Sequence, residues 1–164
     1  MDALKAMAAR RSVRHYNGKA IEKAILEQLV DAGRLAPTAR NEQPWDFVVV
    51  TDRATLQRLG SLADHGRFIA ESGACVVVLC RDTKYYLEDG CAATENILVA
   101  AAALGVDSCW VAGDKKEYCA TILELLHVPA GYKLVSLLAL GHRSADPKLH
   151  PKRSVSEVLH WEKF

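Results

Sequence analysis

The sequence lacks the short motifs that identify several large enzyme classes. It contains neither G-x-G-x-x-G nor G-x-x-x-x-G-K-[ST], the glycine-rich patterns that bind dinucleotides and nucleoside triphosphates. The six histidines form no H-E-x-x-H or H-x-x-x-H pair, and no G-x-S-x-G is present. A Rossmann dinucleotide site, a P-loop, a metal hydrolase site and a serine hydrolase site therefore find no support.

Cysteine is also sparse and unpatterned. There are five cysteines, an odd number, with no C-x-x-C pair and no spacing typical of a zinc site. Cys75 and Cys80 lie within one apolar run, where they are most simply small core residues. This usage predicts a reduced, cytoplasmic protein with no metal.

Long hydrophobic runs and a strong charge of one sign are missing too. The longest apolar run, residues 97–106, is about half of the ~20 residues that a membrane span needs. Residues 1–14 carry charges throughout, so we expect no signal peptide. The net charge of +1 provides no field for holding nucleic acid. Half of the 164 residues are hydrophobic, which predicts a single domain over 1–164 with its own core.

Hydrophobic periodicity predicts alternating helices and strands. Helices are predicted over 1–10, 20–35, 85–104, and after each of Asp52 and Asp114. Strands are predicted over 46–51, 74–81, 107–113 and 133–141. We expect the first strand to be buried, Trp110 to lie in the core, and His65 to lie at the surface. Asp114 to Glu117 fits the outline of a capping box, and Gly105 is a suitable residue to end the long helix.

A polar loop, residues 35–45, connects the second helix to the first strand. Pro37 and Pro44 fix φ at two points and disfavour helix in the residues before them. Between them lie Thr38, Asn41 and Gln43, whose side chains can donate and accept hydrogen bonds. Such a loop suits the edge of a flat heteroaromatic ring, although taken alone it is also compatible with an ordinary connection.

Two basic segments lie near the ends of the chain. In an extended segment, Arg10, Ser12 and Arg14 would project to one side, because successive side chains alternate. Two guanidinium groups and a hydroxyl on one side suit a phosphate or an electron-rich ring edge, or equally a solvated basic turn. The second segment is Pro151-Lys152-Arg153-Ser154.

Together these segments resemble the nitroreductase family, whose members are FMN-dependent homodimers. The family pattern is an R-x-S-x-K/R-x-F/Y start, a P-S-S/A-x-N-x-Q-P-W loop, a G-L-G-x-x-W-x-x-G segment and a late K/R pair. All four occur here in that order, from Arg10 to Arg153, with Asn-x-Gln-Pro-Trp intact.

The resemblance implies an α+β nitroreductase-like fold: a mixed, mostly antiparallel sheet flanked by helices, in an intertwined homodimer. The long Ala-rich helix would form much of the interface, and the C-terminal tail would cross to the other subunit. It also implies an FMN site made of the following residues: Arg10, Arg11, Ser12, Arg14, Pro37, Thr38, Ala39, Asn41, Gln43, Val111, Ala112, Gly113, Lys152 and Arg153.

The same resemblance assigns roles within that site. Arg14 would lie near the pyrimidine end of the ring, where a cation raises the flavin redox potential. Lys152 and Arg153 would face the phosphate with Arg10 and Ser12. Residues 111–113, being small, would let the backbone pass over one face of the ring. The 37–41 loop would come from one subunit and the basic residues from the other.

The activity implied is that of an NAD(P)H oxidoreductase. NAD(P)H would pass hydride to flavin N5 and leave before a nitroaromatic, a quinone or a similar acceptor binds, which predicts ping-pong kinetics without an obligatory catalytic side chain. Three alternatives remain. They are a related flavin reaction (reductive dehalogenation, flavin fragmentation or enone reduction), a non-catalytic FMN-binding protein, and an unrelated α/β domain with solvated basic clusters.

The sequence departs from the family pattern in two places and in length. Ala39 replaces the usual second serine of the loop, and His142 replaces an aromatic residue often found after the late glycine. The chain is also short and lacks room for the helical excursion that covers the active site in larger members. The acceptor, and the roles of His65, Arg67 and His142, are therefore not assigned.

Overall fold

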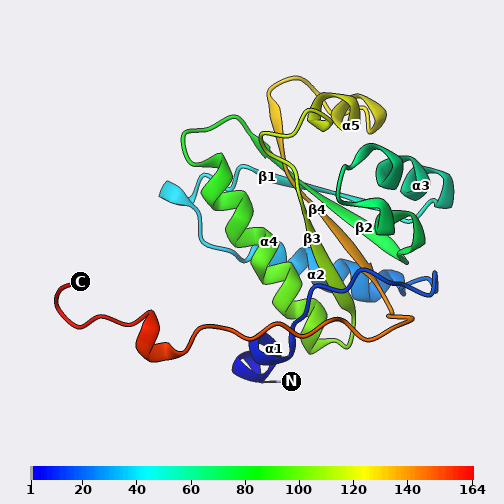
Figure 1. The fold of residues 1–164 in the computed structure, drawn as a ribbon. Helices are drawn as coiled ribbons and strands as arrows, with labels where there is room; N and C mark the ends of the chain where they lie inside the picture. Colours follow the sequence, from blue (N-terminus) through cyan, green and yellow to red (C-terminus); the bar gives the residue numbers. More distant parts are fainter. Residues whose placement is uncertain (1) are drawn as a thin grey trace.

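A four-stranded antiparallel sheet forms the centre of the molecule (Figure 1). The computed structural model describes residues 2–164. The strands are β1 (Trp45–Val50), β2 (Ala74–Arg81), β3 (Asp107–Ala112) and β4 (Tyr132–Gly141), in the spatial order β1-β2-β4-β3. All four predicted strands are confirmed, with β1 and β3 at the two edges.

Helices cover both faces of the sheet (Figure 1). They are α1 (Ala3–Ala9), α2 (Lys23–Arg34), α3 (Arg53–Leu62), α4 (Tyr86–Ala103) and α5 (Cys119–Leu125). Three 3₁₀ segments are η1 (Ala39–Asn41), η2 (Arg67–Glu71) and η3 (Val155–Glu157). The predicted helices are confirmed, and the architecture is the expected α+β type; of the predicted first helix, Met1 lies outside the described residues.

The sheet separates two hydrophobic cores. One lies between the sheet and the α2–α4 layer, and the other between the sheet and the α3–α5 layer. Alternate residues of β2 contribute to each, because successive side chains of a strand point to opposite faces. Cys80 belongs to the first core and Cys75 to the second, both fully buried, as predicted.

A bulge in β4 shapes one end of the sheet. Val78 pairs with Ser136 and Leu79 pairs with Leu134, so Val135 is an extra residue relative to β2. Its carbonyl oxygen accepts a hydrogen bond from the Gly113 N–H at 3.1 Å. The bulge therefore lies beside the end of β3.

Two predicted helix ends are confirmed and one is wrong. The Asp52 carboxylate accepts a hydrogen bond from Thr55 N–H at 2.8 Å, and Gly105 follows α4 with φ of 74°. The predicted capping box at Asp114 does not form. Helix α5 begins only at Cys119, and the Asp114 carboxylate instead accepts a hydrogen bond from the Tyr86 hydroxyl at 2.6 Å.

The edge strands expose side chains that were predicted to be buried. In β1 only Trp45 and Val50 are buried, and Val49 is 39% exposed. Trp110 of β3 is 37% exposed, so its predicted place in the core is wrong for this chain. Both errors have one cause: each strand has a neighbour on one side only, and hydrophobic sequence does not reveal strand order.

The C-terminal tail extends away from the body of the molecule, past α1 (Figure 1). Its large apolar side chains are exposed, as expected for a chain considered alone: Val155, Val158, Leu159, Trp161 and Phe164. None of the helices within residues 2–164 combines the length and apolar character needed to cross a bilayer.

Candidate functional site

The N-terminal basic segment lies along the free edge of β3. Val13 N–H donates to the carbonyl oxygen of Ser108 at 3.0 Å, and Ser12 forms a parallel bridge with Ser108. Val13 and Tyr16 are buried in the α3–α5 core, whereas Ser12 is half-buried and Arg14 is exposed. The pairing with β3 shows an extended backbone at Ser12 and Val13, as predicted. The common side of Arg10, Ser12 and Arg14 stays a prediction.

This edge of the sheet is electropositive. Burial raises the pKa of the Cys109 thiol. The positive charge of Arg14, a hydrogen bond with the Ser12 side chain and the positive charge of Arg10 partly oppose that effect. Arg10 and Arg11 line a cavity of about 250 Å³ together with Arg143. Asp107 pairs with Arg143 at 2.5 Å.

Arg10 and Arg11 have no acidic partner within the described chain. Arg11 donates only to the backbone carbonyls of Ala8 and Arg10, at 2.6 and 2.8 Å. Three arginines and a single aspartate thus line the cavity, so its lining is positively charged. Such a site can hold an anion, and guanidinium groups suit a phosphate in particular.

The last residue of β3 offers a backbone donor at the same edge. Gly113 N–H bonds to Val135, and Val111 pairs with Leu137, so the Ala112 N–H and C=O point away from β4. The Tyr118 hydroxyl donates to the Ala112 carbonyl oxygen. The Ala112 N–H therefore faces the free edge, where a ligand can accept from it.

The packing of the chain itself constrains both Gly113 and Val111. A Cβ on Gly113 would lie 2.7 Å from the Leu134 carbonyl oxygen and 2.8 Å from that of Val135. The Val111 side chain is buried in the α3–α5 core. Of the three residues predicted to lie against the ring, Ala112 alone is exposed at the surface.

The polar loop before β1 is held in an unusual conformation. Arg40, Asn41 and Gln43 have φ of 56°, 57° and 46°, in the left-handed region that side chains disfavour. Thr38 Oγ1 accepts from Gln43 N–H at 3.2 Å. The Asn41 side chain is exposed and makes no hydrogen bond within the described chain, so it is available to a ligand.

Two side chains outside the loop anchor it. Arg81 Nη2, at the end of β2, donates to the carbonyl oxygens of Glu42 and Gln43 at 3.1 and 3.2 Å. Asp89 Oδ1, on α4, accepts from Ala39 N–H at 3.0 Å. Sequence reasoning missed Asp89. One signal in the sequence could have identified it: Asp89 is spaced four and eight residues from the apolar Ala93 and Ile97, which predicts a carboxylate on the buried face of the helix. The structure shows these three residues in one buried stripe of α4.

The structure brings only some of the predicted residues together. Arg10–Arg14 and residues 111–113 lie at the β3 edge, whereas residues 37–43 precede β1, with β2 and β4 between the two edges. Lys152 and Arg153 are exposed in the tail, and within the described chain no hydrogen bond or ion pair joins them to Arg10 or Ser12. His65 is exposed, as expected.

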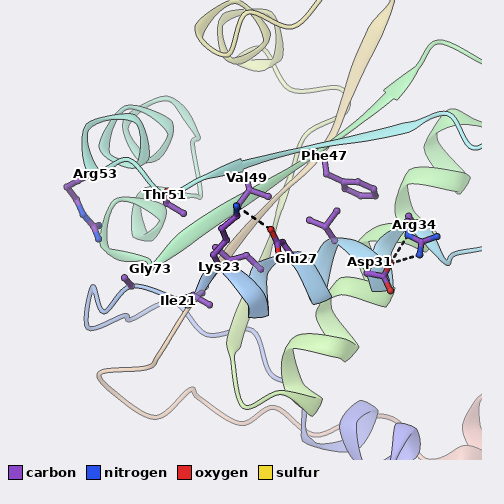
Figure 2. Close-up of a pocket in the computed structure, with 13 residues that line it drawn as sticks. Ile21, Lys23, Glu27, Asp31, Arg34, Phe47, Val49, Thr51, Arg53 and Gly73 are labelled. Carbon is purple, nitrogen blue, oxygen red and sulfur yellow. Dashed lines mark hydrogen bonds and ion pairs between the residues drawn. The ribbon is translucent and has the colours of Figure 1, made fainter.

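None of the predicted residues lines a second, mostly apolar groove. This groove, about 880 Å³, lies between α2 and β1 (Figure 2). Its apolar lining includes Ile21, Leu26, Val30, Phe47 and Val49. Nowhere in residues 2–164 do three His, Cys, Asp or Glu side chains gather in a way that could hold a metal ion.

Comparison with known sequences gives a consistent result. A sequence model described as the nitroreductase family matches residues 7–86 and 68–142. A protein of Archaeoglobus fulgidus, described as an NADH dehydrogenase/NAD(P)H nitroreductase, is 34% identical, and the alignment covers 99% of both chains.

Solved structures are similar as well. A Bacteroides thetaiotaomicron protein with the same description superimposes with a TM-score of 0.92 and is 26% identical, over 99% of this chain and 98% of the other. A structure described as a nitroreductase in complex with FMN, from Desulfovibrio desulfuricans, has a TM-score of 0.85 and 26% identity, over 100% and 98% of the two chains.

Proposed function

This chain belongs to the nitroreductase family, and on that premise we propose that it is an FMN-dependent NAD(P)H oxidoreductase that functions as a homodimer. One observation carries the proposal. The segment from Arg10 to Arg14 pairs with the free edge of β3, so its basic side chains and the free Ala112 N–H lie along the same edge.

The donors along this edge fit FMN. The electropositive cavity at Arg10 and Arg11 suits the phosphate, and the outward Ala112 N–H suits an acceptor atom of the ring. Arg14 extends the positive charge along the segment and would favour an anionic ring. Bound FMN would supply the electron transfer between NAD(P)H and an acceptor such as a nitroaromatic or a quinone. The protein's part is to bind, orient and exclude water, so no side chain is named as an acid or base.

The arrangement of the loop supports a dimer. Thr38, Ala39 and Asn41 lie on the β1 side of the sheet, away from the basic segment of the same chain. A second copy would bring its loop to the β3 edge of the first, completing two equivalent sites at the interface. A site assembled from one chain alone would lack the Asn41 amide.

The exposed tail and the α2–β1 groove support the same assembly. Four charged side chains of the groove pair with one another: Lys23 with Glu27 at 3.5 Å, and Asp31 with Arg34 at 2.6 Å (Figure 2). The floor of the groove is apolar. The tail residues Val158, Leu159 and Trp161 are apolar and uncovered. We propose that the tail of each chain covers the groove of its partner, where it would also shield the free edge of β1.

Sedimentation equilibrium tests the dimer. The wild type should sediment at twice the chain mass of 18.0 kDa. Deleting residues 155–164, or replacing Val49 in the groove by Lys, should give a monomer that no longer retains FMN. A control substitution at Arg58, exposed on α3, should leave the dimer intact. A wild type that sediments as a monomer while binding FMN would contradict the shared site.

Steady-state kinetics test the enzymatic activity. FMN-reconstituted protein should consume NADH or NADPH when menadione is supplied, and double-reciprocal plots should be parallel if donor and acceptor use the same face of the flavin in turn. A protein that binds FMN but consumes neither nucleotide would be a flavin carrier, and the oxidoreductase proposal would be wrong.

A further inference from the structure

We propose that Asp89 is a positioning residue for the loop 38–43, holding it in the conformation that presents Asn41. The loop's role as a flavin-binding element rests on the proposed function. The hydrogen bond that carries the inference does not: Asp89 Oδ1 accepts from Ala39 N–H at 3.0 Å, across 50 positions of sequence.

The burial of Asp89 calls for a reason. The side chain is only 4% exposed, and its second oxygen, Oδ2, has no hydrogen-bond partner within the described chain. A buried carboxylate is unfavourable unless it is well paired. The first turn of α4 offsets part of that cost, because the positive end of the helix dipole favours an acidic group there. In every other respect an apolar residue at this position of the stripe would serve α4 equally well.

The loop is what requires the contact. Arg40, Asn41 and Gln43 are all left-handed, and a backbone of this kind persists only where its surroundings hold it. Arg81 fixes the limb of the loop that enters β1, through the carbonyls of Glu42 and Gln43.

Asp89 fixes the opposite limb through Ala39, so Asn41 lies between two anchors. Each anchor comes from a different element, β2 or α4. The position of Asn41 is thereby set relative to the sheet at one end of the loop and relative to α4 at the other. Without Asp89 only the β2 anchor would remain.

Hydrogen exchange of the flavin-free protein tests this role directly. We compare peptides that cover residues 37–43 in the wild type, Asp89→Ala and Asp89→Asn. Exchange should be faster in Asp89→Ala. It should stay close to wild type in Asp89→Asn, whose amide oxygen can still accept from Ala39 N–H.

A matched control separates positioning from general destabilisation. Thr94 lies five residues further along α4 and shares a buried hydrogen bond of 2.7 Å with Ser136. Thr94→Val removes a buried hydrogen bond from the same helix without touching the loop. It should lower the thermal midpoint while leaving exchange over residues 37–43 unchanged.

FMN binding provides the second readout. Asp89→Ala would loosen the whole loop 38–43 and not the Asn41 amide alone, so it should bind FMN about tenfold more weakly, with an altered visible spectrum. Asp89→Asn and Thr94→Val should bind FMN like the wild type. Two results would overturn the inference. In the first, the loop of Asp89→Ala exchanges at the same rate as the loop of the wild type; in the second, the loop exchanges equally fast in Asp89→Ala and in Thr94→Val. If the wild type binds no FMN but the exchange pattern holds, the proposed function fails and the positioning role stands.

Discussion

The hydroxyl of Tyr118 donates a hydrogen bond to the carbonyl oxygen of Ala112. The next residue, Cys119, donates from its thiol to the carbonyl oxygen of Gly113 at 2.9 Å. The N-cap residue and the first residue of α5 therefore bind the carbonyl oxygens of the last residue of β3 and of the residue after it. This contact fixes the segment that we propose lies against the flavin.

Replacing Tyr118 by Phe tests that contact. The substitution removes one buried hydrogen bond and should lower the free energy of unfolding by about 0.5–1.5 kcal/mol, measured by urea denaturation. Because the end of β3 is loosened, the visible spectrum of bound FMN should shift as well. Tyr132→Phe, which removes an exposed hydrogen bond to Asp46, is the control and should leave the spectrum unchanged. Identical urea midpoints for Tyr118→Phe and the wild type would argue against a structural role.

The same tyrosine predicts a pH dependence of stability. Burial, and then the neighbouring Cys119 thiol and Asp64 carboxylate, raise the pKa of Tyr118 to about 12. In the unfolded chain the phenol titrates near pH 10, so between these values the folded state binds more protons. The stabilisation from the neutral phenol is complete below about pH 10 and is lost as the pH rises towards 12. The stability advantage of the wild type over Tyr118→Phe should shrink across this interval, and a constant difference up to pH 11.5 would contradict the shift.

Removing the Asn41 side chain should change the flavin without releasing it. Asn41→Ala is expected to retain FMN but to alter its reduction potential or the rates of NAD(P)H oxidation. Alanine at φ of 57° also carries a conformational cost of roughly 1–2 kcal/mol, which glycine avoids. Effects common to Asn41→Ala and Asn41→Gly therefore report the lost amide. If both variants match the wild type in potential and rates, Asn41 does not face the ring.

Arg153 is predicted to contact the FMN phosphate in the dimer. In the single chain its guanidinium donates only to the Glu157 carbonyl, at 2.5 Å, and the side chain is exposed. Arg153→Ala should weaken FMN binding by ~1.5–3 kcal/mol through loss of a charge-assisted hydrogen bond. Arg58→Ala on α3 is the charge-matched control. Unchanged flavin retention in Arg153→Ala would remove this residue from the phosphate site.

Much of the fold follows from sequence pattern because local signals agree with tertiary burial. The apolar stripe of Leu26 and Leu29 identifies α2, and both residues are buried. The uninterrupted apolar run of β2 reflects a strand covered on both faces. Strand order is not a local property. The exposure of Val49 and Trp110 could therefore not be predicted without the sheet topology.

The candidate site shows the same division between local and distant information. The alternation of Arg10, Ser12 and Arg14 indicates their common side, and the structure confirms the extended segment. Two features depend on partners far along the chain and were missed: the anchoring of Ala39 by Asp89, and the contact between Tyr86 and Asp114 that replaces the capping box.

Gly113 is under a structural constraint that its sequence context does not reveal. Its missing Cβ accommodates the backbone of β4 and does so whether or not a ligand is present. Only the folded chain reveals which neighbour a small residue makes room for.

The visible spectrum of freshly purified protein, recorded before and after anaerobic addition of NADPH and then of NADH, tests the central claim most directly. We predict flavin absorption bands that bleach on addition of at least one nucleotide, because the Arg10–Arg14 edge should retain FMN and leave one face of the ring open to the donor. A colourless protein that cannot be reconstituted with FMN would contradict the assignment of a flavin site.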